Sequence, residues 1–114
     1  MKRLNLYPYY ENLIQSKTKT TTIRLGDRTN KYKVGDVVVI TVGWDEKEAK
    51  EIAQGSITNI KMKKINELND LDLNGESPDC VFKDSVKYVM SSIYRTIVKD
   101  NDYVTIIKWK YNGE

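Results

Sequence analysis

The 114-residue chain contains no histidine and a single cysteine, Cys80. The absence of histidine excludes Ser-His-Asp and Cys-His catalysis, and every zinc site that needs an imidazole ligand. A lone cysteine excludes an internal disulfide and Cys-rich zinc sites, and we expect Cys80 to be a small buried residue in a reducing cytoplasm. Any catalysis must therefore use Lys, Asp, Glu, Thr, Ser or Tyr side chains.

Long apolar segments are also absent. No run approaches the roughly 18 apolar residues that span a bilayer, and the N-terminal residues lack the apolar stretch of a secretory signal. The composition, 39% hydrophobic and 31% charged, is typical of one soluble globular domain over residues 1–114. We expect a cytoplasmic protein, taken as a monomer, with no membrane partner.

The hydrophobic pattern predicts the element order β-α-β-β-β-α-β. Strands are expected at 3–6, 20–25, 37–42, 55–65 and 101–111, and helices within 7–17 and 84–97. The apolar run 37–42 predicts a strand buried on both faces, and the broken alternation of 55–65 predicts a bulged or edge strand. Residues 45–51 are expected to form a hairpin tip or solvated helical turn, and 66–79 a loop. The expected fold is mainly β with helices (α+β), a small barrel or rolled sheet with two or more helices packed at its ends.

Several other patterns have ordinary explanations. Residues 70–75 match the first half of a calcium-binding loop, but its twelfth position is Val81 rather than glutamate, so we expect neither a metal nor another cofactor. The basic stretch 61–64 is expected on the solvated face of a strand, with a phosphate-contacting patch as the alternative. Trp44 and Trp109 are expected in the core or at a rim rather than as base-stacking platforms.

The segment Lys19–Arg24, with the sequence KTTTIR, combines cations with hydroxyls. It is either a polar edge strand protected by lysine or a functional site. In a protein without histidine, a buried lysine can act as a base and a nearby threonine as a nucleophile, while arginine offers a planar donor group. On a regular strand Lys19 and Thr22 point to opposite faces, so they meet only if Lys19 precedes the strand or a bulge intervenes.

These residues resemble the signature of the ASCH family of PUA-like barrels, Gly-x-Lys-x-x-(Glu or Thr)-x-Arg. Lys19, Thr22 and Arg24 fit, whereas Lys17 stands where the family has glycine. The segments YKVGDVVVI, GSITNIKMKKINEL, SSIY and YVTIIKW also resemble ASCH elements in the same order, so the similarity spans nearly the whole chain. The resemblance implies a PUA-like barrel that recognises RNA or a nucleoside.

One bacterial branch of this family is similar to an amidohydrolase that removes the acetyl group of N4-acetylcytidine. By this resemblance Lys19 and Thr22 are catalytic, the acidic partner is Asp79 with Glu76 as the alternative, and Lys17 and Arg24 bind substrate. In the implied reaction Lys19 activates the Thr22 hydroxyl, the carboxyl group protonates the departing amine, and Arg24 or backbone N–H groups hold the oxyanion. The alternatives are an RNA-binding module without chemistry and, more distantly, a ribonuclease.

Overall fold

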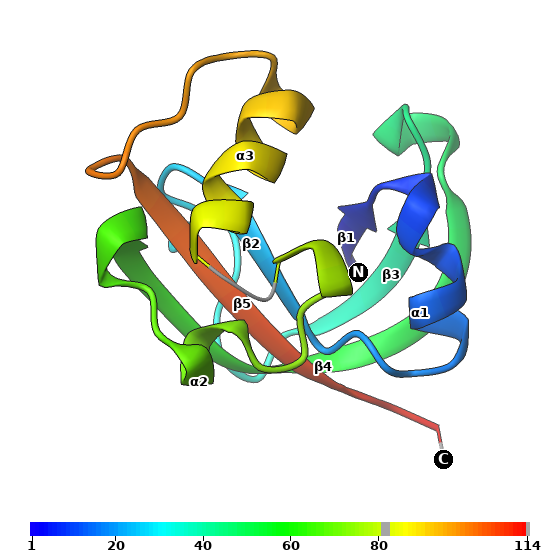
Figure 1. The fold of residues 1–114 in the computed structure, drawn as a ribbon. Helices are drawn as coiled ribbons and strands as arrows, with labels where there is room; N and C mark the ends of the chain where they lie inside the picture. Colours follow the sequence, from blue (N-terminus) through cyan, green and yellow to red (C-terminus); the bar gives the residue numbers. More distant parts are fainter. Residues whose placement is uncertain (81–82, 114) are drawn as a thin grey trace.

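The computed structural model describes residues 1–80 and 83–113, and its five strands form one mixed sheet curled into a half-barrel (Figure 1). The expectations for the Cys80 side chain and for Val81 lie outside the described residues. The strands are β1 (Lys2–Leu6), β2 (Thr21–Leu25), β3 (Val37–Val42), β4 (Lys50–Lys64) and β5 (Tyr103–Tyr111). The α-helices are α1 (Glu11–Gln15), α2 (Asp70–Leu73) and α3 (Lys83–Tyr94), and the short 3₁₀ turns are η1 (Pro8–Tyr10), η2 (Glu46–Glu48), η3 (Ile65–Glu67) and η4 (Pro78–Cys80).

The strand order is β1-β3-β4-β5-β2, with a parallel β1–β3 pair and antiparallel pairing elsewhere. β1 and β2 are therefore the two edges of the sheet. The curl brings these edges close together, and the Arg24 guanidinium of β2 donates a hydrogen bond across the gap to the Asn5 carbonyl of β1. The expected fold class is confirmed, as a half-barrel whose two edge strands are joined by a side chain rather than by ladder pairing.

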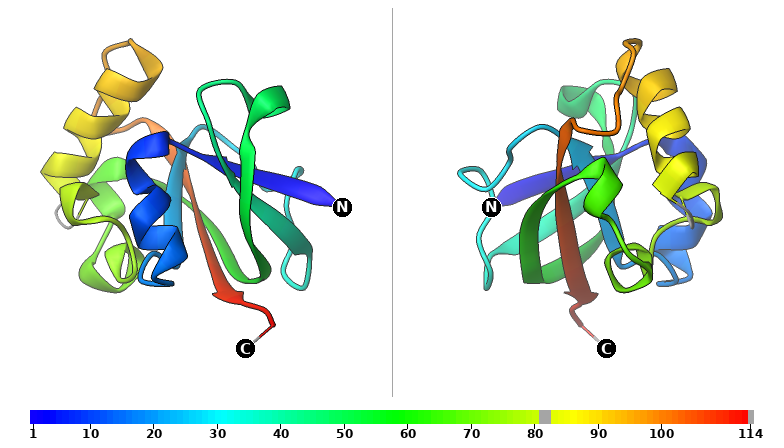
Figure 2. Two further views of the ribbon diagram at one scale, coloured as in Figure 1. Left: turned by 90° about the vertical axis from the view of Figure 1, so that its right-hand side faces the viewer. Right: turned by 60° about the vertical axis from the view of Figure 1, so that its left-hand side comes forward.

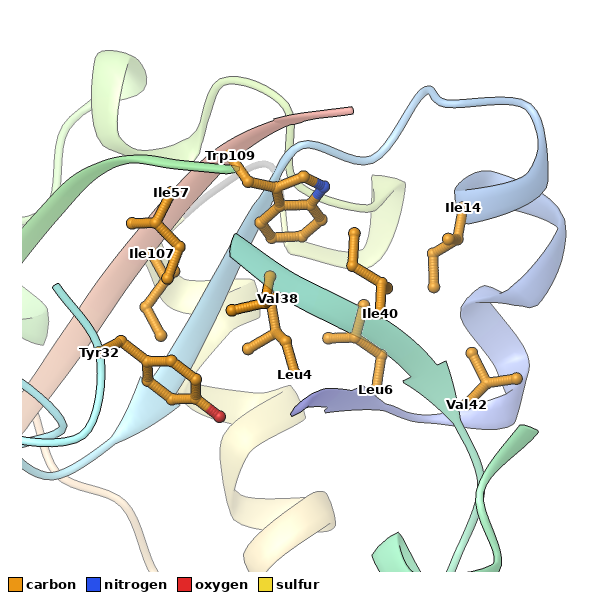
Figure 3. Packing of buried hydrophobic residues seen from close by; sticks show 10 residues of the cluster. All are labelled: Leu4, Leu6, Ile14, Tyr32, Val38, Ile40, Val42, Ile57, Ile107 and Trp109. Carbon is orange, nitrogen blue, oxygen red and sulfur yellow. The ribbon is translucent and has the colours of Figure 1, made fainter. Parts of the chain in front are cut away.

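Two apolar clusters stabilise the sheet from its opposite faces. Figure 3 shows the cluster inside the curl, which includes Ile14 of α1 together with Ile40, Ile107 and Trp109. The second cluster lies on the outer face, where α3 covers β2 and β5 (Figure 2). Alternate residues of β5 face the two clusters, as the strand period requires. Trp109 is 3% exposed and belongs to the core, as expected.

β3 lies at the predicted 37–42, whereas β4 (Lys50–Lys64) begins well before the predicted 55–65, and both strands differ from the prediction in burial or pairing. Val37 is 41% exposed, so β3 is buried on both faces only beyond its first residues. β4 is bulged, because its register shifts against β3 between Ile40 and Thr41 and against β5 between Ile57 and Asn59. It lies inside the sheet between β3 and β5, so the edge alternative is wrong.

The helix predictions hold with shifted ends. α3 ends at Tyr94, and Ile97 lies beyond it with 82% of its surface exposed, so Ile97 does not belong to the helix's apolar face. The charged segment 45–51 contains η2 at the tip of the β3–β4 hairpin, as expected, but its last residues, Lys50 and Glu51, already belong to β4. Among the described residues no helix has the length and apolar character to cross a membrane.

Lys17 forms the turn that joins α1 to β2. It has a left-handed φ of 61°, its N–H bonds to the Ile14 carbonyl at 3.0 Å, and the N–H of Thr18 bonds to the Leu13 carbonyl at 2.9 Å. This pair of bonds is a Schellman motif, whose left-handed residue is usually glycine. The glycine of the ASCH signature thus has a conformational reason at this position, and Lys17 takes the same conformation at a cost.

Replacing Lys17 with glycine is therefore expected to raise the free energy of unfolding by about 0.5–1 kcal/mol, since a non-glycine residue in the left-handed region costs roughly 1–2 kcal/mol and glycine loses part of this through chain entropy. Urea unfolding measures the change. Ser16→Gly is the matched control, because Ser16 has an ordinary φ of −80° and its replacement should destabilise. Destabilisation by both changes would contradict this account of the turn.

The segment 66–79 is not the loop that the sequence predicts, since it contains α2. Asn69 accepts a hydrogen bond from the Asp72 N–H at 3.0 Å, and Asp72 accepts one from the Asn69 N–H at 3.1 Å, which is a reciprocal capping arrangement. The Asp72 carboxylate, 1% exposed, also accepts a hydrogen bond from Lys63 at 2.7 Å. Burial opposes ionisation of Asp72, but Lys63, the Asn69 N–H and Lys61 outweigh it and hold its pKa below the usual value.

A lowered pKa in the folded state means that Asp72 stabilises the protein above the pKa of the unfolded chain, roughly 4, and that this contribution is lost as pH falls through the lower folded value. Asp72→Asn should therefore cost about 1–3 kcal/mol at pH 7. The difference from the parent chain should shrink below pH 4. Urea unfolding across pH 2–7 tests this, and a difference that stays constant with pH would oppose it.

Candidate functional site

A pocket of about 230 Å³ opens where the two edge strands approach each other. Its walls come from β1 and the residue after it, from β2, from the β3–β4 hairpin, from α3, and from the segments before β2 and after α2. The lining residues are Asn5, Leu6, Tyr7, Tyr10, Lys19, Thr22, Ile23, Arg24, Gly43, Trp44, Glu76, Met90, Ile93 and Tyr94. The segment singled out in the sequence therefore lines a concave site.

Lys19 lies before β2, so strand alternation does not force it to the face opposite Thr22, and both residues line the pocket. The Lys19 side chain is 1% exposed and forms an ion pair with Glu76, whose side chain is 3% exposed. Lys19 Nζ also donates to Ser77 Oγ at 2.9 Å, and Ser77 donates from its N–H and hydroxyl to Glu76 Oε1 at 2.7 and 2.8 Å. The ring of Tyr10 covers the ammonium at 4.7 Å. Two opposite charges are thus buried together at the pocket wall.

The backbone around Gly75 places Glu76 beside Lys19. The Gly75 carbonyl accepts hydrogen bonds from the N–H groups of Thr20 and Thr21 at 2.8 and 3.1 Å, so the segment after α2 is fixed along the start of β2. A Cβ atom at position 75 would lie 2.2 Å from Thr20 Oγ1, and the φ angle of Gly75 is +86°, in the left-handed region. Only glycine fits this close approach.

Thr22 and Arg24 extend from β2 into the same pocket. Thr22 is 5% exposed. Burial lowers the pKa of the Arg24 guanidinium from its usual value, and one of its N–H groups is engaged by the Asn5 carbonyl. An amine, a carboxylate, a hydroxyl and a guanidinium therefore line one cavity, and groups of these types can serve as base, acid, nucleophile and oxyanion donor in acyl transfer.

Two predicted site residues lie outside this lining. The Asp79 carboxylate accepts a hydrogen bond from the Tyr10 hydroxyl at 2.9 Å, so it contacts the pocket only through a lining residue. Lys17 is exposed in the turn after α1. Of the two acidic candidates, Glu76 is the one in contact with Lys19.

Three aromatic rings form a cluster at the mouth of the pocket, which we call the aromatic rim: Tyr7, Tyr9 and Trp44. Their centroids lie 5.0–6.3 Å apart. Tyr9 and Trp44 are 78% and 68% exposed, although they are large apolar side chains. Tyr7 and Trp44 also line the pocket. Trp44 therefore lies outside the core, and its exposed ring can stack on a planar ligand.

No family model matches the sequence, and no curated protein is significantly similar to it. Solved structures do match. The ASCH domain of Lactobacillus crispatus JV-V101 superimposes with a TM-score of 0.68 at 14% identity, over 90% of this chain and 70% of that one. The chain has the ASCH fold. A mutant of ZmASCH from Zymomonas mobilis gives a TM-score of 0.59 at 16% identity, over 94% and 65% of the two chains. A structure described as a hypothetical protein gives 0.68 at 16% identity, over 98% and 100%.

Within this ASCH fold, sequence reasoning missed the residues that shape the site around the signature. Asn5, Tyr10 and Ser77 belong to no recognisable motif, and each comes from a different segment of the chain than Lys19. The described residues contain no group of three or more His, Cys, Asp or Glu side chains arranged to hold a metal ion. The polar side chains of the pocket lining include amine, carboxyl, hydroxyl and guanidinium groups.

Proposed function

We propose that the pocket recognises a pyrimidine nucleoside, free or within RNA, and hydrolyses the exocyclic amide of N4-acetylcytidine. The observation that carries the proposal is the buried Lys19–Glu76 pair, which shares one pocket with the Thr22 hydroxyl. The cavity of about 230 Å³ is below the usual range for drug-sized ligands, about 300–1,000 Å³, and suits a group the size of one base.

The contact between Lys19 and Glu76 supplies both proton-transfer roles. When the proton of the pair resides on Glu76, Lys19 is an amine that can accept the Thr22 hydroxyl proton, and Glu76 is an acid. Thr22 Oγ attacks the acyl carbon, the C–N bond breaks, and Glu76 gives its proton to the departing exocyclic nitrogen. Lys19 then holds the threonine proton. Water then attacks the acetyl–threonine ester: Glu76, now a carboxylate, accepts a proton from the water, and Lys19 returns its proton to Thr22 Oγ. The site is regenerated, and the products are cytidine and acetic acid, which ionises to acetate.

The developing oxyanion needs a donor, and the Arg24 guanidinium of the lining can supply one, because the Lys19 ammonium is paired with Glu76. The Arg24 guanidinium donates one hydrogen bond to the Asn5 carbonyl and has further N–H groups that can donate to a ligand. This role predicts loss of turnover rather than of nucleoside affinity when Arg24 is changed.

The proposal is tested by incubating the protein with N4-acetylcytidine and separating cytidine from it by chromatography. The parent protein is expected to release cytidine and acetate, and Lys19→Ala to release neither. Asp79→Asn and Lys17→Ala are matched charge-removing controls outside the lining and should retain turnover. An absence of turnover in the parent protein would overturn the amidohydrolase assignment.

The aromatic rim predicts that Trp44 stacks on the bound base. Trp44→Ala should weaken nucleoside binding by roughly 5- to 100-fold, since base–aromatic stacking contributes about 1–3 kcal/mol. Trp44 is far more exposed than Trp109, so quenching of its fluorescence measures binding in the parent protein and calorimetry measures it in the variant. Trp44→Phe, which keeps an aromatic ring, should bind nearly as well. Equal affinity of the alanine variant and the parent would remove Trp44 from the binding site.

The second candidate is an RNA-binding module without chemistry. It is favoured by the way Glu76, Ser77 and the Tyr10 ring hold the Lys19 ammonium, an arrangement that a structural ion pair would also have. This alternative predicts no turnover together with salt-dependent binding of single-stranded RNA.

A further inference from the structure

We propose that the main-chain N–H and C=O groups of Ile23 bind the hydrogen-bonding edge of the base, its ring nitrogen and its exocyclic N–H. This inference rests on the proposed function for the kind of ligand, a nucleobase, but not for the reaction.

The antiparallel register of β2 and β5 determines where the Ile23 groups point. The Thr20 carbonyl accepts from the Trp109 N–H at 3.0 Å, and the Gly26 N–H donates to the Tyr103 carbonyl at 2.8 Å. The N–H and C=O groups of successive residues point to alternate sides of a strand, so the main-chain groups of Thr22 and Arg24 also point toward β5. The groups of Ile23 therefore point away from β5, toward the free edge of the sheet.

Along this free edge, the residues on both sides of Ile23 have partners. The Thr21 N–H donates to the Gly75 carbonyl at 3.1 Å, and the Leu25 N–H donates to the Tyr94 hydroxyl at 3.2 Å. Between them lies Ile23, which is 2% exposed, and no described residue bonds to its outward N–H or C=O. Buried main-chain groups are nearly always paired. Ile23 lines the pocket, so a ligand there is in place to pair with them.

The main-chain groups of Ile23 and the edge of a nucleobase are chemically complementary. An extended residue presents its N–H and C=O side by side on one strand edge, which matches a neighbouring acceptor and donor on a heteroaromatic ring. Cytosine offers ring N3 as the acceptor and the exocyclic N4–H as the donor. Binding this edge at Ile23 would place the acylated nitrogen beside Thr22, the adjacent residue, and would leave the ring face for the aromatic rim.

The test is a titration of ¹⁵N-labelled protein with cytidine, which cannot be hydrolysed at an amide. Substitution of Ile23 with proline would remove the N–H but also a core side chain, so the experiment follows the Ile23 amide of the parent protein instead. Among residues 21–25, the Ile23 amide resonance should move most on binding, and the hydrogen exchange of this amide should slow at least roughly tenfold at saturation. An unmoved Ile23 amide while Thr22 and Trp44 respond, or no response at any of these residues, would overturn the inference.

Ligand analogues give an independent readout. 3-Deazacytidine lacks the ring acceptor and N4,N4-dimethylcytidine lacks the donor, so each should bind roughly tenfold more weakly than cytidine. 2′-Deoxycytidine, which keeps the same edge, is the control and should bind like cytidine. Equal affinity of all four ligands would contradict edge recognition. A protein that binds cytidine at Ile23 but does not hydrolyse N4-acetylcytidine would refute the proposed reaction and leave this inference standing.

Discussion

Lys19→Met is expected to lower the free energy of unfolding at pH 7 by about 3–5 kcal/mol, the usual cost of leaving one member of a buried ion pair without its partner. Methionine keeps most of the side-chain length, so packing changes little. Glu76, with a 3% exposed side chain, would then hold an uncompensated charge against the pocket wall. Urea unfolding followed by circular dichroism measures the loss.

The double variant Lys19→Met, Glu76→Gln separates charge from packing. Removing both charges should recover most of the lost stability, since the remaining amide can still accept a hydrogen bond from the Ser77 hydroxyl. Lys17→Met, at an exposed position two residues earlier, is the matched control and should change stability by less than about 0.5 kcal/mol. A small loss in the single variant with no recovery in the double variant would show that the two charges are not coupled.

Thr22→Val should reduce kcat/KM for N4-acetylcytidine by about 10³-fold or more while the protein stays folded. Valine has nearly the same shape as threonine and a high β-strand propensity, so the main change is the loss of the hydroxyl. Removal of a nucleophile leaves the binding groups in place, and KM should change far less than kcat. Steady-state release of cytidine gives both constants.

Two further variants make the Thr22 result specific. Thr22→Ser keeps a hydroxyl and should retain activity within roughly tenfold of the parent. Thr20→Val removes a hydroxyl two residues away whose side chain is not part of the pocket lining, and it should retain full turnover. If the valine variant at position 22 turned over normally, water rather than Thr22 would be the attacking group.

The sequence predicted the elements of the fold well where the pattern reflects burial on a sheet. Strands β1, β2, β3 and β5 and the longest helix lie close to where periodicity places them, because each has an apolar face, whereas β4 begins at Lys50, before the predicted range of 55–65. α2 was missed because its four residues are held by the Asn69–Asp72 cap and the Lys63 contact rather than by an apolar stripe. The sequence also did not show that β4 lies inside the sheet, because bulges interrupt the alternation of apolar and polar residues along this strand.

The candidate site was predictable only in the part that is contiguous in sequence. Lys19, Thr22 and Arg24 could be named from their residue types and signature, and the requirement that Lys19 precede the strand followed from strand geometry. The choice between Glu76 and Asp79 could not be made, because it depends on the Gly75 contacts across 55 residues of chain, which no local pattern encodes.

The most direct test of the central claim is to identify the acetylated residue during turnover. Mixing the protein with N4-acetylcytidine, quenching in acid within the first turnover and mapping peptides by mass spectrometry should show one acetyl group on Thr22, which disappears as acetate is released. Release of acetate with no acetyl group on Thr22 at any time point would contradict the account, and so would an acetyl group on another residue that forms and decays at the rate of turnover.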